Sequence, residues 1–241
     1  MTTRLACLSD IHANLTAFET VLADLDRQKP DQVIFLGDAA TLGPQPRAVM
    51  ARLRALGCPC IMGNHDAFTL DRATAPDLHW VPDWYARQLT DADLDFIRTF
   101  QPRLTLPLTG NRTLLCSHGS PKSNTDQIFP TTPAGKLEAM LEGHPADLYL
   151  GGHTHIQMMK QYKGRLVINA GSVGMPFELV PFPETGPRFL PWAEYTIIND
   201  DGGSLGIELR RIPLDMQKLR ESYFSSQMPD ATYWYGLWLD K

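Results

Sequence analysis

The sequence predicts an α/β protein in which two packed β-sheets are flanked by helices. In the first sixty residues, short apolar runs alternate with stretches whose apolar residues repeat at helical spacing, and this alternation is typical of βαβ units. The second half is rich in short apolar runs, which favours two packed sheets over one open sheet. No internal repeat, low-complexity tract or linker divides the 241 residues, so we expect a single domain over residues 1–241.

The first part of the chain should alternate strand and helix. Strands are expected at residues 5–9, 33–36 and 59–62. Two helical faces lie between them, one formed by Leu15, Phe18, Val21, Leu22 and Leu25, the other by Val49, Leu53 and Leu56. The second of these helices should end at Gly57. Because ligand sites of such sheets lie beyond the carboxyl ends of the strands, the polar residues that follow each strand are the candidates for function.

The remainder is predicted to be mostly strand. A helix is expected between Thr132 and Gly143, where Leu137, Met140 and Leu141 form an apolar face. The expected strands are at residues 113–116, 148–150, 157–162, 166–169, 193–198 and 205–212.

Composition and charge exclude several classes of protein. The chain has 22 Lys and Arg against 27 Asp and Glu, a net charge of −5, which argues against a nucleic-acid-binding face or a polybasic membrane anchor. With 43% hydrophobic and 20% charged residues, it is not a disordered chain. Its four cysteines are too few and too irregularly spaced for a disulfide framework, and the sequence contains no recognisable signal peptide or membrane span. We therefore expect a cytoplasmic protein with no membrane partner.

Polar clusters follow five of the predicted strands. They are Asp10-Ile11-His12, Gly37-Asp38, Gly63-Asn64-His65-Asp66, Ser117-His118-Gly119 and Gly151-Gly152-His153-Thr154-His155. Five of the seven histidines lie in these clusters, which should converge on one edge of the sheets. Carboxylate, amide and imidazole groups are ligands for divalent manganese, iron, zinc, cobalt or nickel. Because no thiolate is present in the set, a closed structural zinc site is disfavoured.

This series of motifs resembles the calcineurin-like metallophosphoesterase superfamily. Asp-x-His, Gly-Asp, Gly-Asn-His-Asp, His-Gly and Gly-His-x-His occur in the order of that family, over residues 10–155. Small bacterial and archaeal members of the phosphodiesterase type are similar in three further stretches, Ser9-Asp10-Ile11-His12-Ala13-Asn14, Gly43-Pro44-Gln45-Pro46 and Asn169-Ala170-Gly171-Ser172-Val173. The resemblance implies a four-layer αββα sandwich of two mixed β-sheets flanked by helices.

The resemblance also implies a site with two divalent metal ions. One ion would be held by Asp10, His12, Asp38 and His155. The other would be held by Asp38, Asn64, His118 and His153, so that Asp38 bridges the two. His65 would be the catalytic histidine outside the coordination sphere, with Asp66 orienting its imidazole. Two ions, roughly 3.5–4 Å apart, would acidify a bridging water and clamp the phosphoryl oxygens during in-line attack.

The expected activity is hydrolysis of phosphodiesters, with small nucleotide-type substrates among the candidates, by attack of a metal-bridging hydroxide. A protein serine/threonine phosphatase or a dinucleoside-polyphosphate hydrolase is the alternative among enzymes. The former is weakened by Leu42, which stands where those enzymes place an arginine. A purple acid phosphatase is disfavoured because no tyrosine follows Asp38 at ligand spacing.

A non-catalytic scaffold of the same fold is the alternative from another class of protein. Family members of that kind lack the catalytic histidine or several ligands, whereas His65 and all seven ligands are present here.

Three aromatic and proline-rich segments surround the motifs. Lid excursions are candidates at residues 67–90 and 174–192, and an aromatic tail covers residues 223–241. We expect the tail to dock on the body of the same chain rather than on a partner, although a homo-oligomer stays open. Relatives often carry an arginine shortly after the proline that is Pro176 here, a place that Phe177 occupies in this chain.

Overall fold

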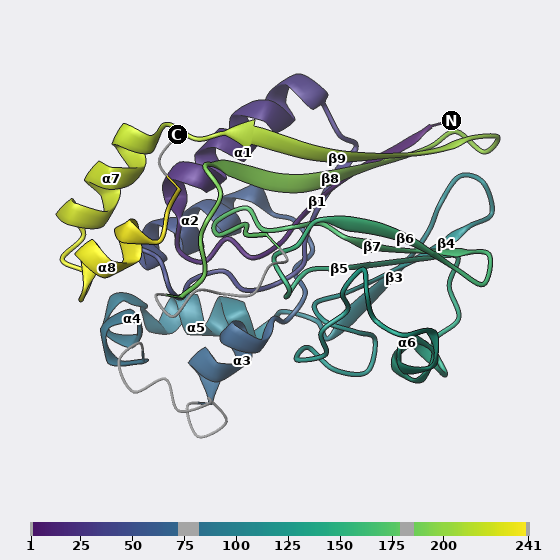
Figure 1. Cartoon of the computed structure of the whole chain (residues 1–241), viewed down its shortest axis with the longest axis horizontal. Coiled ribbons are helices and arrows are strands. Elements are labelled where there is room, and N and C mark those ends of the chain that lie inside the picture. Colours follow the sequence, from purple (N-terminus) through teal and green to yellow (C-terminus); the bar gives the residue numbers. More distant parts are fainter. Residues whose placement is uncertain (1, 72–81, 179–185, 240–241) are drawn as a thin grey trace.

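Two mixed β-sheets pack against each other in the computed structural model, which describes residues 2–71, 82–178 and 186–239 (Figure 1). The first sheet has the strand order β2-β1-β8-β9, and the second has the order β3-β4-β5-β7-β6. Apolar side chains from both sheets, among them Leu5, Ile34, Leu114, Leu150 and Ile168, form the core between them. With helices on both outer faces, the chain has the αββα architecture that the motif resemblance implied.

Both ends of the chain contribute to the first sheet. Strand β1 pairs in parallel with β2 and antiparallel with β8, which in turn pairs antiparallel with β9. The bounds are Thr3–Leu8 for β1, Gln32–Phe35 for β2, Trp192–Asp200 for β8 and Leu205–Pro213 for β9. The N-terminal βαβ unit is therefore completed by a hairpin from the C-terminal part of the chain.

The second sheet is built from the middle of the chain. Its central strands β4, β5 and β7 are parallel, and β3 and β6 pair antiparallel at the two edges. The bounds are Arg103–Pro107 for β3, Thr113–Ser117 for β4, Leu148–Gly151 for β5, Met158–Tyr162 for β6 and Arg165–Asn169 for β7.

Helices cover the outer face of each sheet. The first sheet is covered by α1 and α2, which bury their predicted apolar faces, and α7 packs against α1; the second sheet is covered by α6 (Figure 1). Helix α2 ends at Gly57, which has a left-handed backbone as predicted. The bounds are Leu15–Gln28 for α1, Pro46–Leu56 for α2, Ala134–Leu141 for α6 and Met216–Ser225 for α7. No helix among the described residues has the length and apolar character needed to cross a membrane.

The structure corrects the prediction of a strand at residues 59–62. This stretch forms only two isolated bridges, Phe35 with Cys60 and Ile61 with Gln101. Pro59 lacks an N–H group, and helix α3 starts at Asn64, so the extended stretch is too short for a ladder. Strand β3 and five helices were not foreseen; these helices are α7, described above, α3 at Asn64–Leu70, α4 at Pro82–Gln88, α5 at Asp91–Arg98 and α8 at Ala231–Gly236.

The aromatic tail docks on the body of the chain. Tyr223, Trp234 and Trp238 are all buried in the apolar cluster that also contains the buried face of α1. The candidate lid segments fall partly on residues 72–81 and 179–185, which lie outside the described residues, so the lid remains a prediction.

A buried carboxylate ties helix α1 to the β8–β9 hairpin. Asp24 accepts hydrogen bonds from the Tyr195 hydroxyl at 2.5 Å, from Arg210 Nε at 2.9 Å and from Arg27 Nη2 at 2.8 Å. Burial alone would raise the pKa of Asp24, but these hydrogen bonds hold it below its usual value. The charged form of Asp24 therefore stabilises the fold.

We expect Asp24→Asn to lower stability by about 2 kcal/mol, the typical value of hydrogen bonds to a charged group, which is about 4–8 °C in melting temperature for a chain of this size. Since the pKa is lowered on folding, this contribution is present above pH 4 and is lost as the pH falls through the folded-state pKa. The difference in melting temperature between wild type and variant should be constant from pH 5 to 8 and should disappear in acid. The exposed Asp26 on the same helix gives the control Asp26→Asn, and equal melting temperatures for Asp24→Asn and wild type would contradict the assignment.

Candidate metal centre

Most of the candidate ligands lie on loops and have a left-handed backbone. Five of them have positive φ: 54° at Asp10, 45° at His12, 65° at Asp38, 66° at His153 and 56° at His155. Asp and His enter this region more readily than most residues, and such backbone strain is concentrated at functional sites. Cross-loop bonds hold the conformation, since the amide of Asp10 donates to Gly37 O at 2.9 Å and that of His12 to Asp38 O at 3.0 Å.

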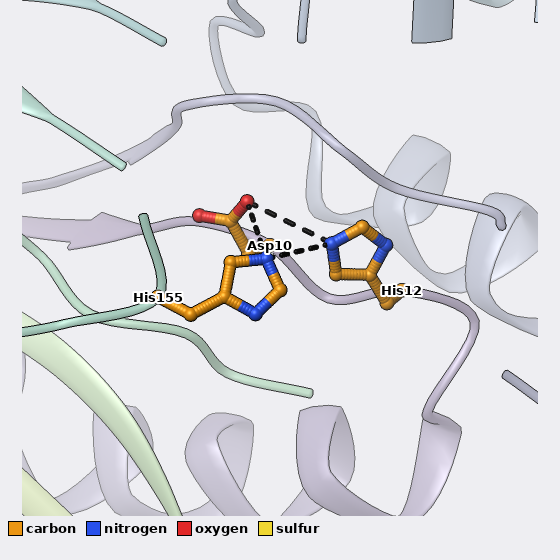
Figure 2. Close-up of side chains that lie close together, drawn as sticks. All are labelled: Asp10, His12 and His155. Atoms are coloured by element: carbon orange, nitrogen blue, oxygen red, sulfur yellow. Dashed lines mark hydrogen bonds and ion pairs between the residues drawn. The ribbon is translucent and has the colours of Figure 1, made fainter. Parts of the chain in front are cut away.

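One group of ligands consists of Asp10, His12 and His155 (Figure 2). Nε2 of His155 lies 3.3 Å from Oδ1 of Asp10 and 3.0 Å from Nε2 of His12. Nε2 of His12 is 3.8 Å from the same carboxylate oxygen. All three side chains are buried, and they come from the loops after β1 and β5. Their ligand atoms thus point toward one common centre.

The second group consists of Asp38, His118 and His153, with Asn64 beside it. Nε2 of His118 lies 3.3 Å from Oδ2 of Asp38 and 3.0 Å from Oδ1 of Asn64. The rings of His118 and His153 have their centroids 5.2 Å apart. These residues come from the exits of β2, β4 and β5 and from the first turn of α3.

Asp38 lies between the two groups. Its Oδ2 atom is 3.7 Å from His12 Nε2 in one group and 3.3 Å from His118 Nε2 in the other. Its Oδ1 atom accepts the backbone N–H of His65 at 2.9 Å, which fixes the carboxylate. The structure therefore brings all seven expected ligands into one cluster, with Asp38 in the position of a bridge.

Backbone carbonyls determine which imidazole nitrogens face the centre. Nδ1 of His155 donates to Met175 O at 2.7 Å, and Nδ1 of His118 donates to Leu36 O at 2.8 Å. In the neutral imidazoles, the Nε2 lone pairs then face carboxylate oxygens. Among the described residues, Oδ1 of Asp10 is buried and has no hydrogen-bond partner. Lone pairs that converge in this way require protons or cations between them, so the donor set fits divalent metal ions.

The electrostatics of the cluster favour positive charge at its centre. Burial opposes charge on His118 and His155, but nearby Asp38 and Asp10 raise the pKa of His118 to about 10, and Asp10 raises that of His155. Burial also opposes ionisation of Asp10, yet His155 and His118 lower its pKa to about 2. Burial lowers the pKa of His12 to about 3 and that of His153 to about 4.

Metal binding should therefore release protons. Since the pKa of His118 is raised to about 10, its Nε2 carries a proton at pH 8 in the metal-free protein, and a metal ion must displace it. The affinity for the metal ion should rise by up to about tenfold per pH unit for each proton released, and it should level off above the pKa of His118. Calorimetric titration in two buffers of different ionisation enthalpy measures the release. An affinity that does not change between pH 7 and 9 would contradict this prediction.

Asp66 does not orient the His65 imidazole, contrary to the sequence-based expectation. Its Oδ2 atom accepts the backbone N–H groups of Asp38 at 2.7 Å and Gly63 at 3.0 Å, and its Oδ1 atom accepts that of Ala39 at 3.0 Å. Burial and the nearby Asp38 raise the pKa of Asp66 to about 6. Asp66 thus holds together the two loops that carry Asp38 and Asn64.

His65 lies beside the ligand cluster on the first turn of α3. Its ring is edge-on to that of His12, with the centroids 5.2 Å apart, and 5.7 Å from that of Phe68. It is partly exposed, and its ring nitrogens have no hydrogen-bond partner in the described part of the chain. Burial lowers its pKa although Asp38 opposes the change. The imidazole is therefore placed to meet a bound molecule.

Two glycines allow the loops to approach this closely. A Cβ atom at Gly63 would overlap the Asp38 carboxylate, and one at Gly152 would overlap the Ser9 hydroxyl and the Asp10 carboxylate. Any side chain at these positions would displace the ligands themselves.

Several residues that support the site were not foreseen as such. Ser172 Oγ donates to Asp10 O at 2.8 Å, and Asn169 Nδ2 donates to Thr154 Oγ1 at 3.0 Å. Both belong to the stretch at residues 169–173 that carried part of the family resemblance, and that motif was the available signal. The carbonyls of Met175 and Leu36 have no counterpart in the sequence pattern.

The fold is that of the metallophosphoesterases, and the cluster contains two groups of residues of the kind that hold divalent metal ions. The chain belongs to the calcineurin-like phosphoesterase superfamily, whose domain matches residues 3–184. This membership supports a hydrolase, and it confirms the resemblance found from the motifs.

Three bacterial or archaeal proteins are similar to the chain over nearly its whole length. It is 24% identical to an uncharacterized protein of Methanocaldococcus jannaschii over 243 residues, which cover 96% of this chain and 95% of that protein. A metallophosphoesterase from Sphaerobacter thermophilus has a similar structure, with a TM-score of 0.77 and 23% identity over 98% of each chain. A hypothetical protein from Pyrococcus horikoshii OT3 has a TM-score of 0.78 and 19% identity over 96% of each chain. These similarities establish the shared fold.

Proposed function

We propose that this protein is a hydrolase of small phosphodiesters, nucleotide-type molecules among them, and that it depends on two divalent metal ions. The observation that carries the proposal is the convergence of seven ligands on two adjacent groups that share Asp38. The proposal treats residues 1–241 as one domain, because β1 pairs with both β2 and the C-terminal strand β8 in a single sheet.

The ligand groups indicate which side chains would hold each ion. Asp10, His12, Asp38 and His155 would hold one, and Asp38, Asn64, His118 and His153 would hold the other. Bound divalent ions of manganese, iron, zinc, cobalt or nickel would supply positive charge for the phosphoryl oxygens and would acidify water. Asp10 and Asp38 offset only two of the four positive charges, so a chain of net charge −5 would attract phosphate at this one place.

His65 is the group proposed to act on the substrate directly. Its partly exposed imidazole lies beside the cluster, and its backbone N–H donates to the bridging Asp38. In this position it can donate a hydrogen bond to a phosphoryl oxygen or a proton to the leaving oxygen. The three amide contacts of Asp66 keep the start of α3, and therefore His65, in register with the β2 exit.

The structure gives no support to the protein-phosphatase alternative. Leu42 packs against the apolar cluster of α1 and α2, at the position where those enzymes place an arginine. Phe177 likewise lies beside His155, at the place where relatives often carry an arginine. Leu42 therefore counts against a phosphoprotein substrate, and the preference for a small diester rests on the family resemblance.

A substrate panel tests the proposal. The protein is loaded with each candidate metal and assayed on bis(p-nitrophenyl) phosphate, p-nitrophenyl phosphate, cyclic nucleotides, diadenosine tetraphosphate and a phosphopeptide, with elemental analysis of the same samples. We expect metal-dependent turnover that is fastest on diesters. Preference for the phosphopeptide or for the dinucleoside polyphosphate would favour the corresponding alternative. Two bound ions with no turnover on any substrate would favour the scaffold.

A further inference from the structure

The end of the described chain forms the outer strand of a small ladder near the metal centre. Phe189 donates its N–H to Leu237 O at 2.8 Å and accepts the N–H of Leu239 at 2.9 Å. On its other side Phe189 forms an antiparallel bridge with Phe177, and Leu190 N–H donates to Pro176 O at 2.8 Å. Three segments, residues 175–177, 189–190 and 237–239, therefore lie side by side, and we call them the C-terminal ladder.

The innermost segment of the C-terminal ladder holds the metal ligand His155. Met175 O accepts the Nδ1 proton of His155 at 2.7 Å, and the N–H of Met175 donates to Ser172 Oγ at 2.8 Å. Ser172 Oγ in turn donates to Asp10 O at 2.8 Å. Two ligands of the same group are thus attached to this segment.

Aromatic rings follow the same path from the tail to the site. The Trp238 ring lies 5.3 Å from that of Phe189, which lies 6.5 Å from that of Phe177. The Phe177 ring lies 5.1 Å from the imidazole of His155, at an angle of 32°. Side-chain packing and backbone hydrogen bonds therefore connect Trp238 to the same ligand.

We propose that Trp238 and the C-terminal ladder position His155, and that they set the metal affinity of the group formed by Asp10, His12 and His155. The other group should be unaffected, because His118 is oriented by Leu36 O, and Leu36 belongs to the core between the sheets rather than to the apolar cluster that contains Trp238. This inference rests on the proposed function, in that the cluster binds two ions. Loss of an outer contact that orients a ligand typically weakens metal binding by about 10–100-fold.

A purely structural role for Trp238 would have a different signature. Trp234 is also a buried tryptophan of the tail, 6% exposed against 5% for Trp238, and it belongs to the same apolar cluster. Removing either ring should lower the melting temperature through the cavity left behind. Only removal of the Trp238 ring should also alter the position of the His155 imidazole.

The experiment compares Trp238→Ala with Trp234→Ala in the full chain, with Trp238→Phe as the conservative rescue. Stepwise Co²⁺ titration followed by visible absorption gives the two affinities. Nitrogen NMR of the histidine rings in the metal-free protein reports the Nδ1–H of His155. Leu239→Pro removes one ladder hydrogen bond without opening a core cavity, and is used if Trp238→Ala does not fold.

We expect Trp238→Ala to weaken the binding of one of the two ions by about tenfold and to leave the affinity for the other unchanged. The nitrogen NMR signal of His155 should shift. Trp238→Phe should retain both properties, and Trp234→Ala should change only the melting temperature. The inference would be overturned if Trp238→Ala weakened the binding of both ions equally or of neither. It would also be overturned if Trp234→Ala caused the same selective loss of affinity for one ion. A wild type that binds no ion would refute the proposed function instead, while the NMR comparison would still test the positioning of His155.

Discussion

Asp38→Asn is expected to reduce bound metal and to lower turnover by at least about 10³-fold. The substitution keeps an oxygen that can accept the N–H of His65, so the loop should stay in place. It puts an amide group where Oδ2 faces His12 and His118, and it removes one negative charge from between the two groups. The loss of several kcal/mol of charge stabilisation in the transition state corresponds to that factor.

Elemental analysis and steady-state kinetics on the same sample check this expectation. Asp26→Asn, which removes an exposed carboxylate from α1, should keep wild-type metal content and rate. Near-normal turnover of Asp38→Asn with two bound ions would show that Asp38 is not the bridge.

His65→Ala should lower turnover by about 10²–10⁴-fold, the usual range for a lost acid or base, while metal content stays at the wild-type level. The imidazole lies beside the cluster and contacts the His12 ring only edge-on, so its removal takes away no ligand. The backbone N–H that donates to Asp38 is retained in alanine. Metal content and kcat, measured on the same sample, distinguish an acid or base outside the coordination sphere from a metal ligand.

His144 provides the matched control. It lies outside the motifs, between α6 and β5, and His144→Ala should be kinetically silent. If His65→Ala loses metal in proportion to its loss of rate, His65 would be a ligand, and the assignment of the seven ligands would have to be changed.

The error at Asp66 has a simple physical cause. His65 and Asp66 are consecutive residues on the first turn of α3, and neighbours at i and i+1 on a helix do not face each other. Asp66 turns back toward the amide of Gly63 in the manner of a capping box, while His65 points toward the cluster. The helix was not foreseen, because residues 59–62 were expected to form a strand and the Gly-Asn-His-Asp motif to follow it as a loop.

The elements with strong periodicity were predicted well, and those that depend on tertiary contacts were missed. The apolar faces of α1 and α2 lie in the core as the spacing indicated. Strand β3 has an exposed, weakly alternating pattern and is an edge strand only because it pairs with β4. Such a strand is stabilised by its partner more than by its own residues.

The sequence by itself determined the identity and the order of the candidate ligands, since five short motifs at strand ends specify which side chains meet at one rim of the sheets. Only the tertiary structure decided how those side chains are held. The carbonyls of Met175 and Leu36 orient His155 and His118, and three amides fix Asp66. Every residue carries a carbonyl and nearly every residue an amide, so these groups leave no trace in a residue pattern, and they act at this centre only because segments far apart in the chain pack together.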